Sequence, residues 1–243
     1  MEYLKNSYKL FKLKNEKGAN MTKKEIAKYI DHTNLSQTAT KEDIAKLCEE
    51  AYKNNFHSVC VNPKYVEFAK QCMLDLGSDV KICTVIGYPL GESTQEIKAM
   101  EAVMAKEGGA DELDVVVSIS AAVTANFEYI YEEIRRIVDC CEIPVKAIVE
   151  TSKLTNDQLI KVCEACIDAG VKFVVANTGY VDKYVALETI KLMSDTVAGV
   201  CEVKSCGAVD NIDMLYDLVC AGATRLGVDN GIAILDGFGK KNK

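Results

Sequence analysis

Two lysines and two aspartates stand within short apolar runs of this chain, where charged side chains are unusual. Lys146 lies in IPVKAIVE and Lys204 in GVCEVKSCG, while Asp31 and Asp114 lie in YIDHT and ELDVVV. Burying a charge is costly unless an opposite charge is close, so these four residues are expected to form one cluster. A buried amine beside a carboxylate can attack carbonyls or move protons. The cluster therefore indicates either metal-independent Schiff-base chemistry or a structural ion pair that fills the core.

The segments that must position these residues alternate between two kinds. Short runs rich in β-branched residues are separated by longer amphipathic stretches, such as KEDIAKLCEEAYKNN and NFEYIYEEIRRIVDCC. The runs occupy residues 29–33, 57–61, 81–86, 112–117, 145–150, 172–177, 199–205 and 224–228. Eight strand–helix units in 243 residues predict an α/β fold, a single (β/α)8 TIM barrel with parallel strands. In such barrels the active site lies at the carboxyl ends of the strands.

This barrel is expected to occupy residues 21–243, because no linker rich in proline, glycine or serine interrupts the chain. Residues 1–20 carry five lysines against two glutamates and scattered apolar residues, which predicts a short, poorly ordered N-terminal extension. Gly108, Gly170 and Gly222 follow helical runs and are expected to end them in the left-handed conformation.

Composition excludes several classes of protein. The formal net charge is -7 with acidic residues spread widely, which argues against a nucleic-acid partner. No apolar run is long enough to span a bilayer and no signal peptide is visible, so we expect no membrane partner and a cytoplasmic location. The eleven cysteines are expected to be free thiols, since the chain is neither short nor loop-rich. No metal site is expected, because only two histidines occur and Cys163-x-x-Cys166 lies in a helical pattern.

Alternation along each strand lets only every second residue face the barrel interior. The polar residues expected on that face are Asp31, Thr33, Cys60, Asp114, Lys146 and Lys204. The stretch KFVVANTGY, residues 172–180, also ends at the predicted mouth of the barrel, but it supplies neither a nucleophile nor a general base there. No glycine-rich dinucleotide fingerprint follows the first strand, which disfavours a Rossmann fold, and no cofactor is expected.

After residue 29 the chain resembles the deoxyribose-phosphate aldolase family over nearly its whole length. The matching stretches are IDHTNL (30–35), VCVNPKYV (59–66), TVIGYPLG (84–91), GADELDVVVSI (109–119), VKAIVETSKLT (145–155), GVKFVVANTG (170–179), VKSCGAV (203–209) and AGATRLGVDNG (221–231). The resemblance implies a TIM barrel and a lyase that acts on a small aldehyde or sugar in deoxyribonucleotide catabolism. It also implies that no metal or cofactor is needed and that the protein forms a homodimer, as family members often do.

The resemblance also implies roles for individual residues. In the family, a sixth-strand lysine forms the Schiff base, a seventh-strand lysine lowers its pKa, and a fourth-strand aspartate relays protons. Lys204 and Asp114 match the second and third of these, and Lys146 matches another family lysine in the fifth strand. Val175 occupies the Schiff-base position, because the family's FVKTSTG reads FVVANTG here. The ligand-binding residues implied are Asp31, Thr33, Leu35, Cys60, Thr178, Gly179, Gly207, Asp229 and Asn230.

Valine cannot form an imine, so the function of the site is open. Lys172 is not expected to replace the missing amine, because it lies about 10 Å from the mouth and points to the other face of its strand. One alternative is an aldolase-type lyase with Lys204 or Lys146 as substitute nucleophile. A second is a catalytically inactive family member that acts as a small-molecule-binding or regulatory protein. A third is acid–base chemistry by Asp114 and Lys204 on another carbonyl compound.

The phosphate-binding end departs from the family as well. The family usually has paired glycines after the seventh strand and two serines before a glycine after the eighth, where this chain has Cys206-Gly207-Ala208 and Asp229-Asn230-Gly231. A carboxylate about 4 Å from a phosphate costs on the order of 4 kcal/mol per unit charge at a protein-like dielectric. Asp229 is also expected to cap the helix that begins near Gly231. An unphosphorylated, hydroxylated ligand, or no ligand, is therefore expected, and Arg225, at the start of the eighth strand, is assigned a structural role.

Overall fold

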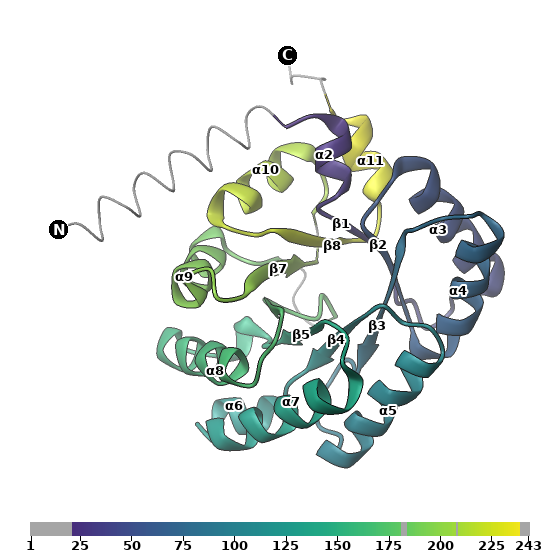
Figure 1. Ribbon diagram of the computed structural model, residues 1–243. Coiled ribbons are helices and arrows are strands. Elements are labelled where there is room, and N and C mark those ends of the chain that lie inside the picture. The colour runs from purple at the N-terminus through teal and green to yellow at the C-terminus, as the bar shows by residue number, and fades with distance from the viewer. Residues whose placement is uncertain (1–20, 181–183, 208, 239–243) are drawn as a thin grey trace.

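The computed structural model describes residues 21–180, 184–207 and 209–238. Eight parallel strands form a closed barrel in which each strand pairs with its neighbours in sequence and β8 pairs with β1 (Figure 1). The strands are β1 (Ile30–Asn34), β2 (Ser58–Val61), β3 (Lys81–Ile86), β4 (Glu112–Val116), β5 (Val145–Ile148), β6 (Phe173–Val175), β7 (Glu202–Cys206) and β8 (Arg225–Val228). The predicted (β/α)8 barrel is confirmed.

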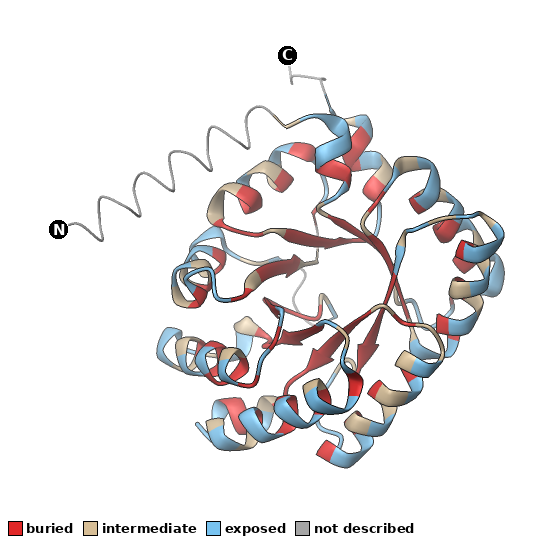
Figure 2. Cartoon of the chain, in the orientation of Figure 1, coloured by how far each residue is buried: buried red, intermediate tan, exposed pale blue. Residues whose placement is uncertain are grey.

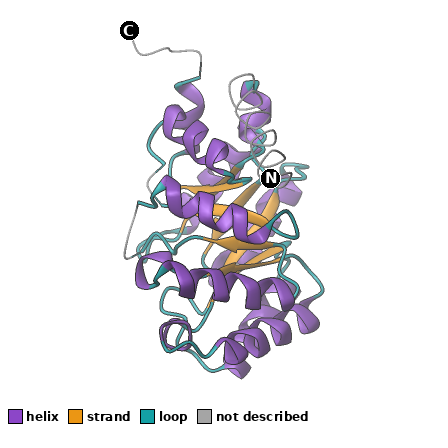
Figure 3. Cartoon of the chain, turned by 90° about the vertical axis from the view of Figure 1, so that its left-hand side faces the viewer, coloured by secondary structure: helices purple, strands orange, loops and turns teal. Residues whose placement is uncertain are grey.

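Helices surround the barrel, as the side view in Figure 3 shows. They are α2 (Lys23–Ala27), α3 (Lys41–Asn54), α4 (Val66–Asp75), α5 (Gln95–Glu107), α6 (Ile119–Val123), α7 (Phe127–Cys141), α8 (Asn156–Asp168), α9 (Leu187–Val197), α10 (Ile212–Ala221) and α11 (Gly231–Asp236), with 3-10 turns at Pro63–Tyr65 and Thr151–Lys153. The sequence supplies their starts, since Thr40, Thr155 and Asn211 each accept a hydrogen bond from a backbone N–H of the first turn.

Buried residues run along the strands and along the helix faces that point toward the barrel (Figure 2). On β6, Val174 packs into the large core between strands and helices, whereas Phe173 and Val175 pack with Val116 and Ile148 inside the barrel. The alternation of the strand thus sends successive side chains to opposite faces, as predicted. This inner apolar cluster comes from β4, β5 and β6, and charged residues of β1, β4, β5, β7 and β8 share the barrel interior with it.

Two of the three predicted glycine caps are correct. Gly170 and Gly222 have φ angles of 93° and 122°, in the left-handed region. Gly108 does not, because the last turn of α5 continues through it with φ -69° and its N–H bonds to the carbonyl of Met104. The left-handed residue is Gly109, with φ 101°.

Three further sequence predictions bear on the chain as a whole. All eleven cysteines lie within the described residues and are free thiols, as predicted. Among the helices of the described ranges, none is both long and apolar enough to cross a membrane. The predicted N-terminal extension, residues 1–20, lies outside the described residues and stays a prediction.

Candidate active site

Three basic and three acidic side chains meet inside the barrel and form one ion-pair network. Its members are Asp31 of β1, Glu112 and Asp114 of β4, Lys146 of β5, Lys204 of β7 and Arg225 of β8. Each is at most 7% exposed. Because three positive charges face three negative ones, the network satisfies the condition under which charges can be buried. The structure therefore brings together the four residues that the sequence predicted to cluster.

Lys204 stands at the centre of this network. Its Nζ lies 2.6 Å from Oδ2 of Asp31 and 2.6 Å from Oδ2 of Asp114. Burial by itself lowers the pKa of Lys204, but the charges of Asp114 and Asp31 outweigh it and hold the pKa well above the ordinary value of 10.5. Lys204 is therefore an ammonium group in the unliganded protein, with two carboxylates positioned to take its proton.

Lys146 is enclosed more deeply than Lys204. Its Nζ lies 2.8 Å from Glu112, 3.0 Å from Asp114 and 3.4 Å from Asp31. Burial opposes its charge, but Asp114 and Asp31 raise the pKa of Lys146 well above the ordinary value. Lys204 borders the cavity described below and Lys146 does not.

Arg225 and Glu112 complete the network on the side away from the cavity. Arg225 Nη1 lies 3.0 Å from Oδ1 of Asp31 and 3.2 Å from Oε2 of Glu112, which fits the structural role assigned to it. Burial raises the pKa of Glu112, but a hydrogen bond from His57 and the charge of Lys146 outweigh it and lower that pKa to about 2. Sequence reasoning missed Glu112, although it lies two residues before Asp114 and so on the same face of the strand.

Val175 lies beside Lys204, as its partner in the parallel pairing of β6 with β7. It is fully buried in the inner apolar cluster with Val116, Ile148 and Phe173. Lys172 lies on the outside of the barrel, where its side chain is 58% exposed and its Nζ lies 3.3 Å from Glu202. Lys204, on the neighbouring strand β7, is therefore the amine that lies beside position 175.

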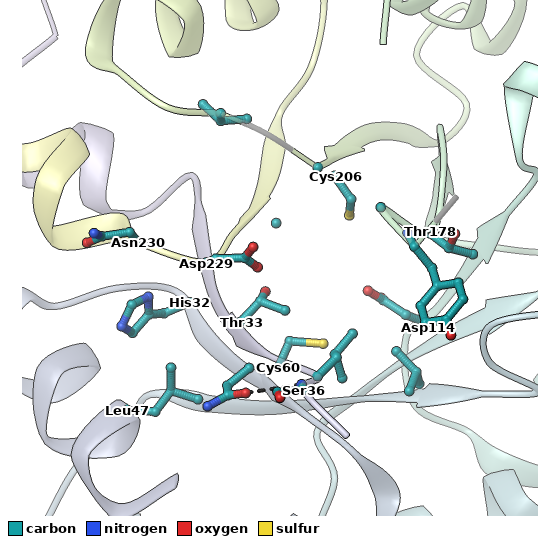
Figure 4. Close-up of a pocket in the computed structure, with 18 of the residues that line it drawn as sticks. His32, Thr33, Ser36, Leu47, Cys60, Asp114, Thr178, Cys206, Asp229 and Asn230 are labelled. Carbon is teal, nitrogen blue, oxygen red and sulfur yellow. Dashed lines mark hydrogen bonds between the residues drawn. The ribbon is translucent and has the colours of Figure 1, made fainter. Parts of the chain in front are cut away.

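A cavity of about 830 Å³ opens at the carboxyl ends of the strands, above the network. Asp114 and Lys204 border it. The residues predicted to bind ligand that also border it are Thr33, Leu35, Cys60, Thr178, Gly179, Gly207, Asp229 and Asn230. Asp31 does not border it and lies behind Lys204. In Figure 4 the carboxylates of Asp114 and Asp229 point into the same space from opposite sides.

The side of the cavity formed by the loop after β6 is held by groups that the sequence reasoning missed. Glu150 is buried and accepts hydrogen bonds from the N–H and hydroxyl of Thr178, at 3.1 and 2.6 Å. Tyr88 donates its hydroxyl to the carbonyl of Thr178 and packs edge-on against Tyr180. Thr178 is therefore fixed on both sides. The sequence signal for Glu150 was its place as the last residue of the predicted strand 145–150.

The predicted cap by Asp229 is wrong. Asn230 caps α11 instead, and its Oδ1 accepts from the N–H of Ala233 at 3.1 Å. Asn230 directly precedes the first helical residue, Gly231, and so reaches the third N–H of the helix. Asp229 lies one residue earlier, which leaves its carboxylate to turn into the cavity (Figure 4).

One set of side chains in the cavity floor could in principle hold a metal ion. The sulfurs of Cys60 and Cys83 and a carboxylate oxygen of Asp114 lie within 4.8 Å of one another. Two ammonium groups already contact the same carboxylate, from Lys146 at 3.0 Å and Lys204 at 2.6 Å. A hydrogen bond with Cys83, together with burial, raises the pKa of Cys60 well above its ordinary value and keeps it a neutral thiol. These charges disfavour a cation at this position.

Comparison with known proteins agrees with this geometry. The model of the DeoC/LacD family of aldolases matches residues 25–235. The deoxyribose-phosphate aldolase of Caldicellulosiruptor saccharolyticus is 44% identical over 219 residues, which cover 88% of this chain and 99% of that protein. That of Thermococcus kodakarensis is 41% identical over 220 residues, covering 89% and 98%. The tetrameric deoxyribose phosphate aldolase of Aeropyrum pernix superimposes with a TM-score of 0.86 at 29% identity, covering 93% of this chain and 96% of that one. The chain belongs to the DeoC/LacD aldolase family.

Proposed function

We propose that this protein is a metal-independent carbon–carbon lyase acting on a small aldehyde or sugar, and that Lys204 is the amine that reacts with the carbonyl. The observation that carries this proposal is the position of Lys204 Nζ. It borders an open cavity and lies 2.6 Å from the carboxylates of both Asp114 and Asp31. Lys146 is the weaker candidate, because it is enclosed by Glu112, Asp114 and Asp31 and does not border the cavity.

The reaction begins when Lys204 transfers its proton to Asp114 and adds to the carbonyl carbon. Asp114 gives this proton to the hydroxyl of the adduct as it leaves as water, which forms a protonated imine and restores the carboxylate of Asp114. The protonated imine then accepts the electron pair of the carbon–carbon bond as that bond breaks. Asp114 takes the proton from the hydroxyl group that becomes the departing aldehyde, and returns a proton to the enamine that remains. Hydrolysis of the resulting imine releases the second product and restores Lys204.

The same contacts make this reaction slow. An amine must be neutral to attack, and the two carboxylates hold the pKa of Lys204 well above 10.5. In the family's arrangement a second lysine lowers the pKa of the nucleophile, whereas here Val175 brings no charge beside Lys204. Cleavage of deoxyribose 5-phosphate at the rate usual for the family is therefore not expected.

A second candidate function is binding without catalysis, and one observation favours it. Lys204 is paired on both sides with carboxylates, and an ammonium ion cannot form an imine. In this case Lys204 donates a hydrogen bond to the carbonyl oxygen of a bound ligand, and the protein acts as a sensor or a regulatory subunit.

Reductive trapping distinguishes the two candidates. The protein is incubated with acetaldehyde and a panel of small aldehydes, reduced with borohydride, and digested so that the modified lysine is identified by peptide mass. We expect the adduct on Lys204, its loss in Lys204→Met, and its retention in Lys172→Met, which removes an exposed lysine outside the barrel. No adduct and no cleavage of any aldehyde would leave binding as the function. Cleavage without an adduct would point to acid–base chemistry by Asp114 and Lys204.

A further inference from the structure

The cavity extends beyond the barrel interior into a side lobe between β1, α3 and α11. This lobe is bordered by His32, Leu47, Glu50, Asp229, Asn230 and Ala233. Figure 4 shows His32, Leu47 and Asn230 together on the side of the cavity away from Asp114. Because Asp114 and Lys204 occupy the reacting end, the lobe is where the far end of a ligand lies. The groups that border it therefore decide which end group the ligand carries.

His32 has an unused hydrogen-bond acceptor at the edge of this lobe. The side chain is 3% exposed, and its Nε2 lies 2.9 Å from Oε2 of Glu50. A carboxylate only accepts hydrogen bonds, so the proton of the neutral ring is on Nε2 and the lone pair is on Nδ1. Nδ1 is buried and has no hydrogen-bond partner among the described residues. Burial lowers the pKa of His32, which keeps the ring neutral and Nδ1 an acceptor.

The carboxylates of the lobe act in the same direction. Asp229 points its carboxylate into the cavity and is close enough to His32 to act on its charge. Glu50 adds a second negative charge, which is partly offset by Lys46, an exposed cation that also borders the cavity and lies 3.8 Å from Glu50. In the first turn of α11, the N–H of Ala233 is already bonded to Asn230 and is not available to an anion. The lobe thus presents acceptors and negative charge to a ligand.

We propose that this lobe binds a protonated amine at the far end of the ligand, so that the substrate class is an unphosphorylated, aminated polyhydroxy compound. The ammonium group donates hydrogen bonds to His32 Nδ1 and to the carboxylate of Asp229, while a phosphate in the same place meets the negative charges of Asp229 and Glu50. This inference rests on the proposed function in one respect, namely that the other end of the ligand carries a carbonyl group that faces Lys204.

Three matched probes test the proposal without requiring any reaction. Ribitylamine, ribitol and ribitol 5-phosphate differ only in their end group, and none has a carbonyl that could form an imine. Titration calorimetry on the full chain is expected to rank the amine first, then the alcohol, then the phosphate. A single opposed charge in a partly buried site predicts that the dissociation constants of the amine and the phosphate differ by about tenfold or more. Equal or tighter binding of the phosphate would overturn the proposal, as would no binding of the amine at millimolar concentration.

Two variants test whether the preference for the amine arises in the lobe. Asp229→Ser removes the carboxylate at an exposed loop position. This variant should weaken binding of the amine about tenfold and strengthen binding of the phosphate. Asp79→Asn removes the same charge from an exposed site before β3, at the opposite end of the barrel, and should leave the ranking unchanged. An equal effect of both variants would show that only net charge matters, and would reject the proposal that the lobe binds the amine. If the amine preference is found but no aldehyde adduct forms, the lobe stands and the lyase proposal falls.

Discussion

Val175 and Lys204 face each other across the parallel pairing of β6 and β7, inside the barrel. One residue of this pair is apolar and packs with Val116 and Ile148, and the other is bonded to two carboxylates. The boundary between the inner apolar cluster and the charged network therefore passes between these two residues. A long side chain placed at position 175 would reach along this boundary toward the floor of the cavity.

Val175→Lys is accordingly expected to create a better nucleophile than Lys204. The new amine would lie beside the ammonium of Lys204, and a neighbouring positive charge lowers an amine's pKa. We expect borohydride trapping of acetaldehyde to move to position 175 and to proceed at least tenfold faster at pH 7.5, because one pKa unit changes the neutral fraction tenfold. Peptide mass and the time course of labelling measure both effects.

The matched control for this variant is Ala147→Lys on the neighbouring strand, whose side chain faces the outer core rather than the cavity. It should give no adduct, and if it is unfolded, exposed Lys172→Arg serves to report non-specific labelling. An adduct that stays on Lys204 in Val175→Lys, at an unchanged rate, would contradict the placement of position 175 beside Lys204 at the cavity floor.

The labelling of Lys204 should depend on pH in a defined direction. Because Asp114 and Asp31 raise its pKa, the rate of adduct formation is expected to rise continuously from pH 7 to pH 10. Asp114→Asn removes the larger of these two charge effects, so the same profile should move to lower pH by about one unit or more. Asp210→Asn changes another carboxylate that borders the cavity, where it accepts a hydrogen bond from Tyr184 rather than from Lys204, and should leave the profile in place. Identical profiles in all three proteins would show that Asp114 does not control the charge of Lys204.

Stability at acidic pH should depend on Glu112. Its pKa is about 2 in the folded protein against an ordinary value of 4.5, so its carboxylate stabilises the fold fully above pH 4.5 and progressively less as the pH falls toward 2. This difference corresponds to on the order of 3 kcal/mol of unfolding free energy. Urea unfolding at a series of pH values should show a flatter decline between pH 4.5 and 2 for Glu112→Gln than for the wild type. Glu67→Gln, at an exposed position, should follow the wild type.

A second buried ion pair lies outside the candidate site and should contribute to stability but not to catalysis. Lys98 Nζ lies 2.7 Å from Glu133 and 2.8 Å from the carbonyl of Val116, and both charged side chains are fully buried. Lys98→Met leaves the Glu133 carboxylate buried without its cation, and should lower the free energy of unfolding by about 3–5 kcal/mol. Lys98→Met combined with Glu133→Leu should recover part of this loss, measured by urea unfolding. A double variant as unstable as the sum of the two single variants would show that the pair does not act as a unit.

The sequence by itself determined the barrel and four of the six members of its charged cluster. Eight β-branched runs at regular spacing predict parallel strands, and alternation along them predicts which residues face inward. Lysine and aspartate in apolar runs cannot be buried singly, so Asp31, Asp114, Lys146 and Lys204 had to meet. The absence of an amine at position 175 was also readable directly, from FVVANTG.

Only the tertiary structure decided how these residues are used. Alternation gives the face of a strand but not the depth at which a residue lies, because depth depends on how neighbouring strands are staggered. That stagger places Lys146 opposite Asp114 and beneath the cavity, and Lys204 opposite Val175 at its floor. The direction of Asp229 was undetermined for a similar reason, since a cap forms only where the backbone of the helix start brings a side chain to a free N–H, and at α11 that side chain is Asn230.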